Sequence, residues 1–149
     1  MIVREVEWDH PDSVAMRVGQ RLDLDVRYGS PDSEPGPHPT AADITVFFVA
    51  YTDDGEAIGS GALRRLDDEH AEIKRMFVEP AHRGSGAASA ILRRLEEFAR
   101  ERHWHRLVLE TGHRQPDAVR FYEREGFHGI PTFGYYVDSA NSLCFEKVL

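Results

Sequence analysis

The stretch from residue 72 to residue 102 constrains the fold of this chain more than any other part. It opens with an apolar run that contains β-branched residues and stops at Pro80, which predicts a strand. It closes with Ile91, Leu92, Leu95 and Phe98 at the spacing of one helix face. A glycine-rich turn separates the two. A strand, a tight turn and a helix start in this order predict an anion site, because the first helical turn presents free backbone N–H groups and the positive end of the helix dipole.

The turn has the composition of a diphosphate site. Gly84 and Gly86 let the backbone approach a ligand closely, and Arg83 can bind phosphate oxygens in a fork. We therefore predict a cradle formed by Arg83, Gly84, Ser85, Gly86, Ala87 and Ala88. A corner whose glycines serve packing only would also explain the turn. A Walker loop is excluded because no Gly-Lys-Ser/Thr is present, and a dinucleotide fingerprint would need a third glycine near Ser89.

Two blocks of the sequence resemble the GNAT family of N-acetyltransferases. The segment from Arg83 to Ala88, which follows the strand end Met76-Phe77-Val78-Glu79-Pro80, resembles the acyl-CoA signature Arg-x-x-Gly-x-Ala of that family. The segment from Gln115 to Phe127 resembles a later helix of the family, with its Ala-x-x-Phe-Tyr-x-x-x-Gly-Phe. The resemblance extends from about residue 44 to residue 149. One departure is visible, because the family often has Asn where Gln115 stands.

The resemblance implies an acyl-CoA-dependent N-acetyltransferase. Such an enzyme moves an acetyl group from acetyl-CoA to a primary amine of a small molecule or peptide by direct attack, and releases coenzyme A. Met76, Phe77 and Val78 would hold the pantetheine arm and contact the oxyanion through backbone groups, and Gln115 and Phe121 would also contact the cofactor. Two alternatives stay open, which are a non-catalytic acyl-CoA sensor or interaction module of the same fold and a nucleotide-binding protein.

Tyr122 and Glu72 are the catalytic residues that the resemblance implies. The Tyr122 hydroxyl would protonate the departing thiolate, since a phenol with a pKa of about 10 and a thiol with a pKa of about 8.5 exchange a proton readily. Glu72 would be the general base, directly or through water. Alternatively, Tyr122 is a core aromatic residue and Glu72 a solvated strand carboxylate. Strand alternation predicts that Glu72 and Lys74 share one face, and that Ile73 and Arg75 share the other.

The acceptor is poorly specified by the sequence. The family builds its acceptor pocket from the first helices and the C-terminal strands. The resemblance therefore predicts substrate contacts from Arg27, Tyr28, Arg75 and Tyr135, with Tyr136 as a further wall residue. It also allows a homodimer, although no residue specifies an interface.

Composition and charge narrow the possible partners. The 149 residues suffice for one domain, 1–149, and the net charge of −8 argues against nucleic acid or an anionic membrane while suiting a cationic amine. No apolar run reaches the ~18 residues of a membrane helix and the N-terminus lacks an apolar signal core, so we expect a cytoplasmic protein. The single Cys144 is expected in the core. His103, His105 and His113 match no ligand spacing, so we expect no metal.

The remaining patterns predict an α/β (α+β), single-domain GNAT-like fold, with a mixed and mainly antiparallel sheet of six to seven strands flanked by about four helices. A helix is expected to end near Tyr28, either continuous or broken at Gly19. The proline-rich loop 29–43 is a spacer or a mobile lid, and we favour the spacer. The other expected strands are 2–7, 44–51, 56–65, one that ends at 78, 105–110 and 142–148. A further helix is expected to open at Pro116 and to close before Gly126.

Overall fold

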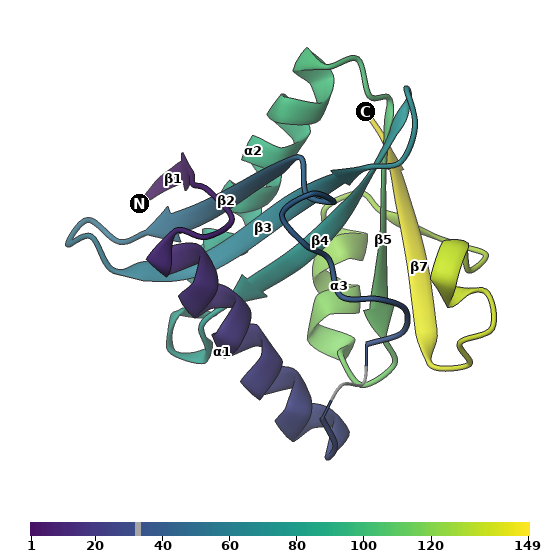
Figure 1. Ribbon diagram of the computed structural model, residues 1–149, viewed down its shortest axis with the longest axis horizontal. Coiled ribbons are helices and arrows are strands. Elements are labelled where there is room, and N and C mark those ends of the chain that lie inside the picture. The colour runs from purple at the N-terminus through teal and green to yellow at the C-terminus, as the bar shows by residue number, and fades with distance from the viewer. Residues whose placement is uncertain (32–33) are drawn as a thin grey trace.

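The computed structural model describes residues 1–31 and 34–149. These residues form a seven-stranded sheet in the order β1-β2-β3-β4-β5-β7-β6, with α1 on one face and α2 and α3 on the other (Figure 1). Every neighbouring pair is antiparallel except β4 with β5. The strands are β1 (Ile2–Glu5), β2 (Val46–Tyr51), β3 (Ala57–Arg65), β4 (His70–Val78), β5 (Arg106–Gly112), β6 (His128–Ile130) and β7 (Ser142–Val148).

The helices are α1 (Pro11–Tyr28), α2 (Ala87–Glu101) and α3 (Pro116–Arg124), with short 3-10 helices η1 (Pro80–His82) and η2 (Gly134–Tyr136). The predicted fold class and the mixed, mainly antiparallel sheet are confirmed. The expected number of about four helices was one too high for the described residues, which form three α-helices. The short strand β6 was not foreseen, since its three residues carry no alternation that a sequence pattern could reveal.

Two apolar clusters hold the helices on the sheet. The cluster on the α2 and α3 side contains, among others, Phe48, Leu63, Ile73, Ile91, Leu92, Leu95, Phe98, Leu107 and Tyr122. The cluster on the α1 side contains Met16, Phe47, Val49, Ala62 and Phe77. Cys144 is a buried free thiol, as its expected core position required.

Helix α1 runs without a break through Gly19, so the alternative of two helices is wrong. A Cβ at this position would lie 2.9 Å from the Glu79 carboxylate and 3.1 Å from the Phe77 ring. The glycine therefore serves close packing of α1 on β4. The helix opens at Pro11, and Gly29, with φ of 68°, ends it in the left-handed conformation.

Strand β4 carries a bulge at Arg75. Its pairing with β3 shifts by one residue here, and Arg75 has φ of 56°, a left-handed conformation that is uncommon for arginine. The extra residue places Arg75 with Lys74, and both side chains reach Glu34. Phe77, which strict alternation would put on the face of Ile73, packs in the α1-side cluster instead. The predicted alternation, with Arg75 on the face of Ile73, is therefore wrong from Arg75 onward.

Strands β4 and β5 pair only from His70–Glu72 to Arg106–Val108 and then diverge. Figure 1 shows the two strands opening as a V, with α3 near the open end. On its other side, β4 stays paired with β3 as far as Val78. The second half of β4 therefore has backbone groups that face an opening instead of a strand.

Candidate active site

The glycine turn before α2 has the geometry of an anion cradle. Gly84 and Gly86 have φ of 82° and 89°, and no atom lies within 4 Å of the place where a Cβ would stand on either residue. Gly86 is the N-cap residue of α2, and it makes no side-chain capping hydrogen bond. Within the described residues, the Ala87 amide lies 3.4 Å from the Ser85 hydroxyl, which accepts its hydrogen bond. The open space and the exposed helix start suit the phosphates of a cofactor.

Arg83 lies at the rim of this cradle in a chain of ion pairs. Its Nε donates to the Val78 carbonyl at 3.1 Å, and its guanidinium pairs with Asp23 of α1 at 3.1 Å. Asp23 also accepts from Arg27 at 3.2 Å, and Arg27 makes two bonds to Asp117 of α3 at 2.7 and 2.9 Å. Arg27, which the resemblance assigned to the acceptor pocket, therefore lies beside the cradle and ties α1 to α3.

A cavity of about 280 Å³, here called the cofactor cavity, lies between the cradle, β4, α1 and α3. The predicted cofactor residues that line it are Met76, Phe77, Val78, Arg83, Gly84, Gly86, Ala87, Ala88, Gln115 and Phe121. Ser85 is absent from this lining because its hydroxyl turns to the Ala87 amide. The Met76 carbonyl accepts a hydrogen bond from the Gln20 side chain at 3.0 Å, so α1 contacts the backbone of β4 here.

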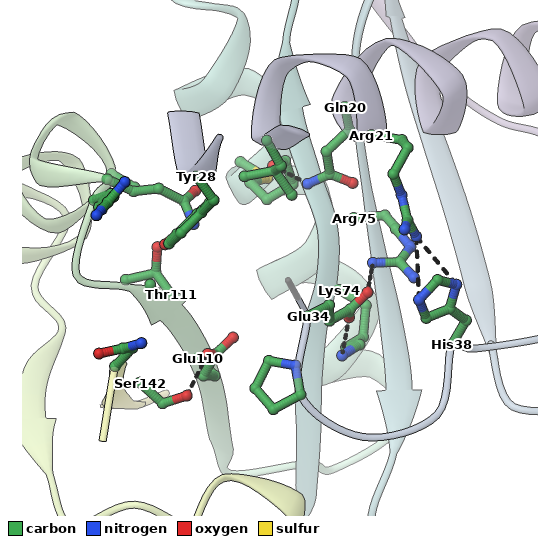
Figure 2. Close-up of a pocket in the computed structure, with 18 of the residues that line it drawn as sticks. Gln20, Arg21, Tyr28, Glu34, His38, Lys74, Arg75, Glu110, Thr111 and Ser142 are labelled. Atoms are coloured by element: carbon green, nitrogen blue, oxygen red, sulfur yellow. Dashed lines mark hydrogen bonds and ion pairs between the residues drawn. The ribbon is translucent and has the colours of Figure 1, made fainter. Parts of the chain in front are cut away.

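A larger cavity of about 730 Å³, here called the acceptor cavity, opens between the diverging strands (Figure 2). The two cavities meet at six shared residues, which are Gln20, Leu24, Met76, Gln115, Ala118 and Tyr122. The proline-rich loop, which we expected to be a spacer, contributes Ser30, Glu34, Pro35, His38 and Pro39 to the lining. Its described part therefore forms a wall of the cavity, while residues 32 and 33 lie outside the described residues.

Tyr122 stands where the two cavities meet, and its side chain is buried. Its ring makes edge contacts with Phe121 and Phe127, with centroids 5.2 and 5.4 Å away. No residue that the structure describes forms a hydrogen bond with its hydroxyl. Burial raises the pKa of this hydroxyl far above its ordinary value. Tyr122 is therefore protonated at neutral pH, which suits a proton donor.

Glu72 is a buried anchor and does not line either cavity. Its carboxylate accepts a hydrogen bond from the Tyr136 hydroxyl at 2.6 Å, and pairs with Arg64 at 3.3 Å and Lys74 at 3.8 Å. The alternative of a solvated strand carboxylate is wrong, because the side chain is 1% exposed. Its role as general base stays a prediction.

Sequence reasoning missed Glu110, a carboxylate that does line the acceptor cavity. It accepts a hydrogen bond from the Ser142 hydroxyl at 2.7 Å, and burial raises its pKa while this bond works in the other direction. The neighbouring Thr111 hydroxyl is buried, and no described residue hydrogen-bonds to it. A glutamate directly after an apolar strand run was the available signal, but only the divergence from β4 shows that it borders a cavity.

The predicted acceptor contacts are distributed unevenly. Tyr28 and Arg75 line the acceptor cavity. The Tyr28 hydroxyl lies against Gly112, 1.5 Å from the place where a Cβ would stand. Tyr135 is 62% exposed and lies outside both linings, because η2 turns Tyr136 inward and Tyr135 outward.

The described residues contain no candidate metal cluster and no candidate membrane-spanning helix. No group of three or more His, Cys, Asp and Glu side chains in them is arranged to hold a metal ion. In the same part of the chain, no helix has both the length and the apolar character needed to cross a membrane.

The glycine cradle, the diverging strands and the joined cavities define a protein that can bring a phosphate-bearing cofactor against a second substrate. Comparison with known proteins identifies the family: residues 17–127 match the model of the Acetyltransferase (GNAT) family. The chain belongs to this family, and it is an acetyltransferase. The resemblance drawn from the two sequence blocks is confirmed.

Individual relatives agree with this assignment. The chain is 36% identical over 112 residues to an IAA acetyltransferase of Azospirillum brasilense, covering 74% of this chain and 72% of that protein. It is 37% identical over 105 residues to the uncharacterized N-acetyltransferase YsnE of Bacillus subtilis, covering 69% of each. A solved Klebsiella pneumoniae structure, designated a candidate acyl-CoA N-acyltransferase, superposes with a TM-score of 0.81 at 28% identity, covering 99% of this chain and 97% of that one.

Proposed function

We propose that this protein is an acetyl-CoA-dependent N-acetyltransferase that acts on a primary amine of a small molecule or peptide. The observation that carries the proposal is the meeting of the two cavities at Tyr122. One cavity ends at the N-terminus of α2, where Gly86 has no side chain to cap the helix, and the other contains the carboxylate of Glu110. Such an arrangement lets a cofactor and an acceptor reach the same point from two directions.

The cofactor cavity fits coenzyme A in its chemistry. The diphosphate would bind the amides after Gly84 and Gly86, where a Cβ would fill space that the glycines leave open. The pantetheine arm would lie along Met76 to Val78, at the edge of β4 that faces the opening. When bound, acetyl-CoA supplies the acetyl thioester that is transferred.

Two residues would move the protons, Tyr122 at the junction and Glu110 in the acceptor cavity. The acceptor amine must lose a proton before it attacks, and Glu110, whose pKa burial raises, is placed to accept that proton at its carboxylate. The hydroxyl of Tyr122 would donate its proton to the departing sulfur. Glu72 remains the second candidate for the base, although its carboxylate is engaged with Tyr136 and two cations and lines neither cavity.

Acetyl-CoA-dependent release of a free thiol, measured with a set of primary amines, tests the proposal. We expect turnover with at least one amine and none without an amine. Binding of acetyl-CoA without turnover on any amine would favour the sensor alternative. Equal binding of ADP and coenzyme A would favour the nucleotide-binding alternative.

The cradle has a matched control in the β2–β3 turn. Gly86→Ala and Gly55→Ala both add a methyl group at positive φ, 89° and 84°, with no atom within 4 Å of the new Cβ. Their backbone strain is therefore comparable. Only Gly86 borders the cofactor cavity, so we expect calorimetry to show weaker coenzyme A binding for Gly86→Ala and unchanged binding for Gly55→Ala. Equal affinities for the two variants would remove the cradle from the binding site.

The base is identified by the pH dependence of kcat/KM. Glu110→Gln removes the carboxylate and keeps an acceptor for the Ser142 hydroxyl. We expect kcat/KM to fall by about 10²–10⁴-fold and its rise with pH to disappear. If Glu72→Gln abolishes this rise and Glu110→Gln keeps it, Glu72 is the base instead.

A further inference from the structure

Positive side chains gather around the acceptor cavity, although acidic residues outnumber Lys and Arg by 26 to 18 in the whole chain. The charged residues of its lining are Arg17, Arg21, Lys74, Arg75 and Arg114, against Asp25, Glu34 and Glu110. The sign of the charge balance in this lining is thus opposite to that of the whole chain. A cavity lined in this way attracts an anionic group on its substrate.

Arg17 of α1 lines this cavity without a carboxylate partner among the described residues. Its guanidinium stacks over the Trp8 ring, 3.7 Å from the centroid, and donates to the Trp8 carbonyl at 2.7 Å and to the Ser13 hydroxyl. These partners are neutral. Burial lowers its pKa, and the nearby positive charge of Arg75 lowers it further. Arg17 and Arg75 both bring positive charge to the lining of this cavity.

The neighbouring cations are only partly neutralised. Lys74 and Arg75 share the carboxylate of Glu34, at 3.3 and 2.9 Å, and both are 11% exposed. Figure 2 shows this group on the β4 side of the cavity. Glu72, the other carboxylate near Lys74, is already paired with Arg64. Arg17, Lys74 and Arg75 together with Glu34 form one wall of the cavity, and this wall keeps an excess of positive charge.

The opposite wall has the complementary chemistry. Glu110 lies on β5, across the opening from Lys74 and Arg75, with Thr111 beside it (Figure 2). Its carboxylate is an acceptor for an ammonium group, and so is the Thr111 hydroxyl, which no described residue hydrogen-bonds. The cavity thus has a cationic wall on β4 and α1 and an acceptor-rich wall on β5.

We propose that the acceptor is an amine that also carries a carboxylate, with Arg17 and Arg75 binding the carboxylate and Glu110 receiving the amine. This inference rests on the proposed acetyltransferase function and names the substrate class for the same site. A guanidinium matches a carboxylate in a planar fork. A phosphate dianion fits less well, because Glu34 stands between Lys74 and Arg75 and would repel the second negative charge.

Amino acids paired with their carboxamides test the inference. Alanine, β-alanine, γ-aminobutyrate and phenylalanine, each beside its carboxamide, differ within a pair only in the anionic group. We expect one acid to exceed its carboxamide by about 10- to 100-fold in kcat/KM, the range for hydrogen bonds to a charged group. The amine of the carboxamide is less basic, so a larger fraction of it is neutral and able to attack at neutral pH. This difference by itself would favour the carboxamide over the acid.

The variants separate carboxylate binding from structure. Arg17→Gln and Arg75→Gln should each bring the ratio of kcat/KM for the acid to kcat/KM for its carboxamide close to one, and a general loss of activity would not change this ratio. Arg114→Gln is the control. Arg114 is an exposed arginine that lines the same cavity, but it donates to the Arg27 carbonyl and is not part of the wall formed by Arg17, Lys74 and Arg75. It should keep the preference.

The failure of this inference can be told from the failure of the proposed function. Acetylation of carboxamides and acids at equal rates would overturn the carboxylate site and leave the acetyltransferase proposal intact. Retention of the preference in both Arg17→Gln and Arg75→Gln would also overturn it. Absence of acetylation for every amine, with coenzyme A still bound, would refute both.

Discussion

Replacing Tyr122 by phenylalanine should separate catalysis from folding. The substitution keeps the ring and its edge contacts with Phe121 and Phe127. It removes a hydroxyl that no described residue hydrogen-bonds, so no interaction within the fold is broken. We therefore expect the free energy of unfolding to change by less than about 0.5 kcal/mol. Turnover should fall by about 10²–10³-fold, the usual loss when a general acid is removed.

A second buried tyrosine provides the matched control. The Tyr136 hydroxyl donates to Glu72 at 2.6 Å and accepts from Lys74 at 3.0 Å. Tyr136→Phe leaves part of a buried carboxylate unsatisfied, which should lower stability by about 2 kcal/mol. For a chain of this size the melting temperature should fall by about 4–8 °C. The same atomic change should thus reduce stability at Tyr136 and turnover at Tyr122.

Three measurements on each variant complete the test. They are thermal unfolding, calorimetric binding of coenzyme A, and thiol release in a single turnover. Normal turnover in Tyr122→Phe would make Tyr122 a packing residue and water the source of the proton. Unfolding of this variant, or loss of coenzyme A binding, would show that the hydroxyl is structural, and the catalytic assignment would be withdrawn.

Three further substitutions address other parts of the site. Arg27 holds the pKa of Asp117 at about 2 through its hydrogen bonds. This contribution is present above the ordinary Asp pKa of about 4 and is lost as pH falls through 2, so Asp117→Asn should cost about 0.5–1 kcal/mol of unfolding free energy at pH 7 and much less at pH 2 in urea titrations. Gly112→Ala should displace Tyr28, because the Tyr28 hydroxyl would lie 1.5 Å from the new Cβ. We expect a higher KM for the acceptor and an unchanged affinity for coenzyme A. An unchanged KM would remove Tyr28 from the acceptor site. Asp23→Asn removes a carboxylate from the cofactor cavity and should tighten coenzyme A binding about two- to fivefold at low salt, whereas weaker binding would show that its ion pairs organise the cavity.

The elements that depend on near neighbours in the chain were predictable. The glycine turn at 84–86, the helix opened at Pro116 and the hairpin strands each have a local cause, such as a positive φ, a fixed φ or an alternating pattern. The same local signals identified the family and the part of the cofactor cavity that two short segments form, whereas the residues that α1 adds to the lining were not foreseen.

The acceptor site could not be predicted in the same way. Glu110 and Ser142 are 32 residues apart, and Glu72 and Tyr136 are 64 apart, so only the folded chain brings each pair together. The bulge at Arg75 was also hidden, since arginine has no preference for a positive φ and pairing with β3 imposes it.

The sequence by itself therefore determined the fold class and the family, and it predicts the place of the cofactor, because all three are encoded in backbone preferences and spacing over a few residues. Tertiary structure decided which carboxylate lines the acceptor cavity and which is a buried anchor. It also decided that the proline-rich loop, through Glu34, forms part of the cavity wall. The physical reason is that burial and the charge of neighbours set the chemistry of an ionisable side chain, and both arise from residues far away in the chain.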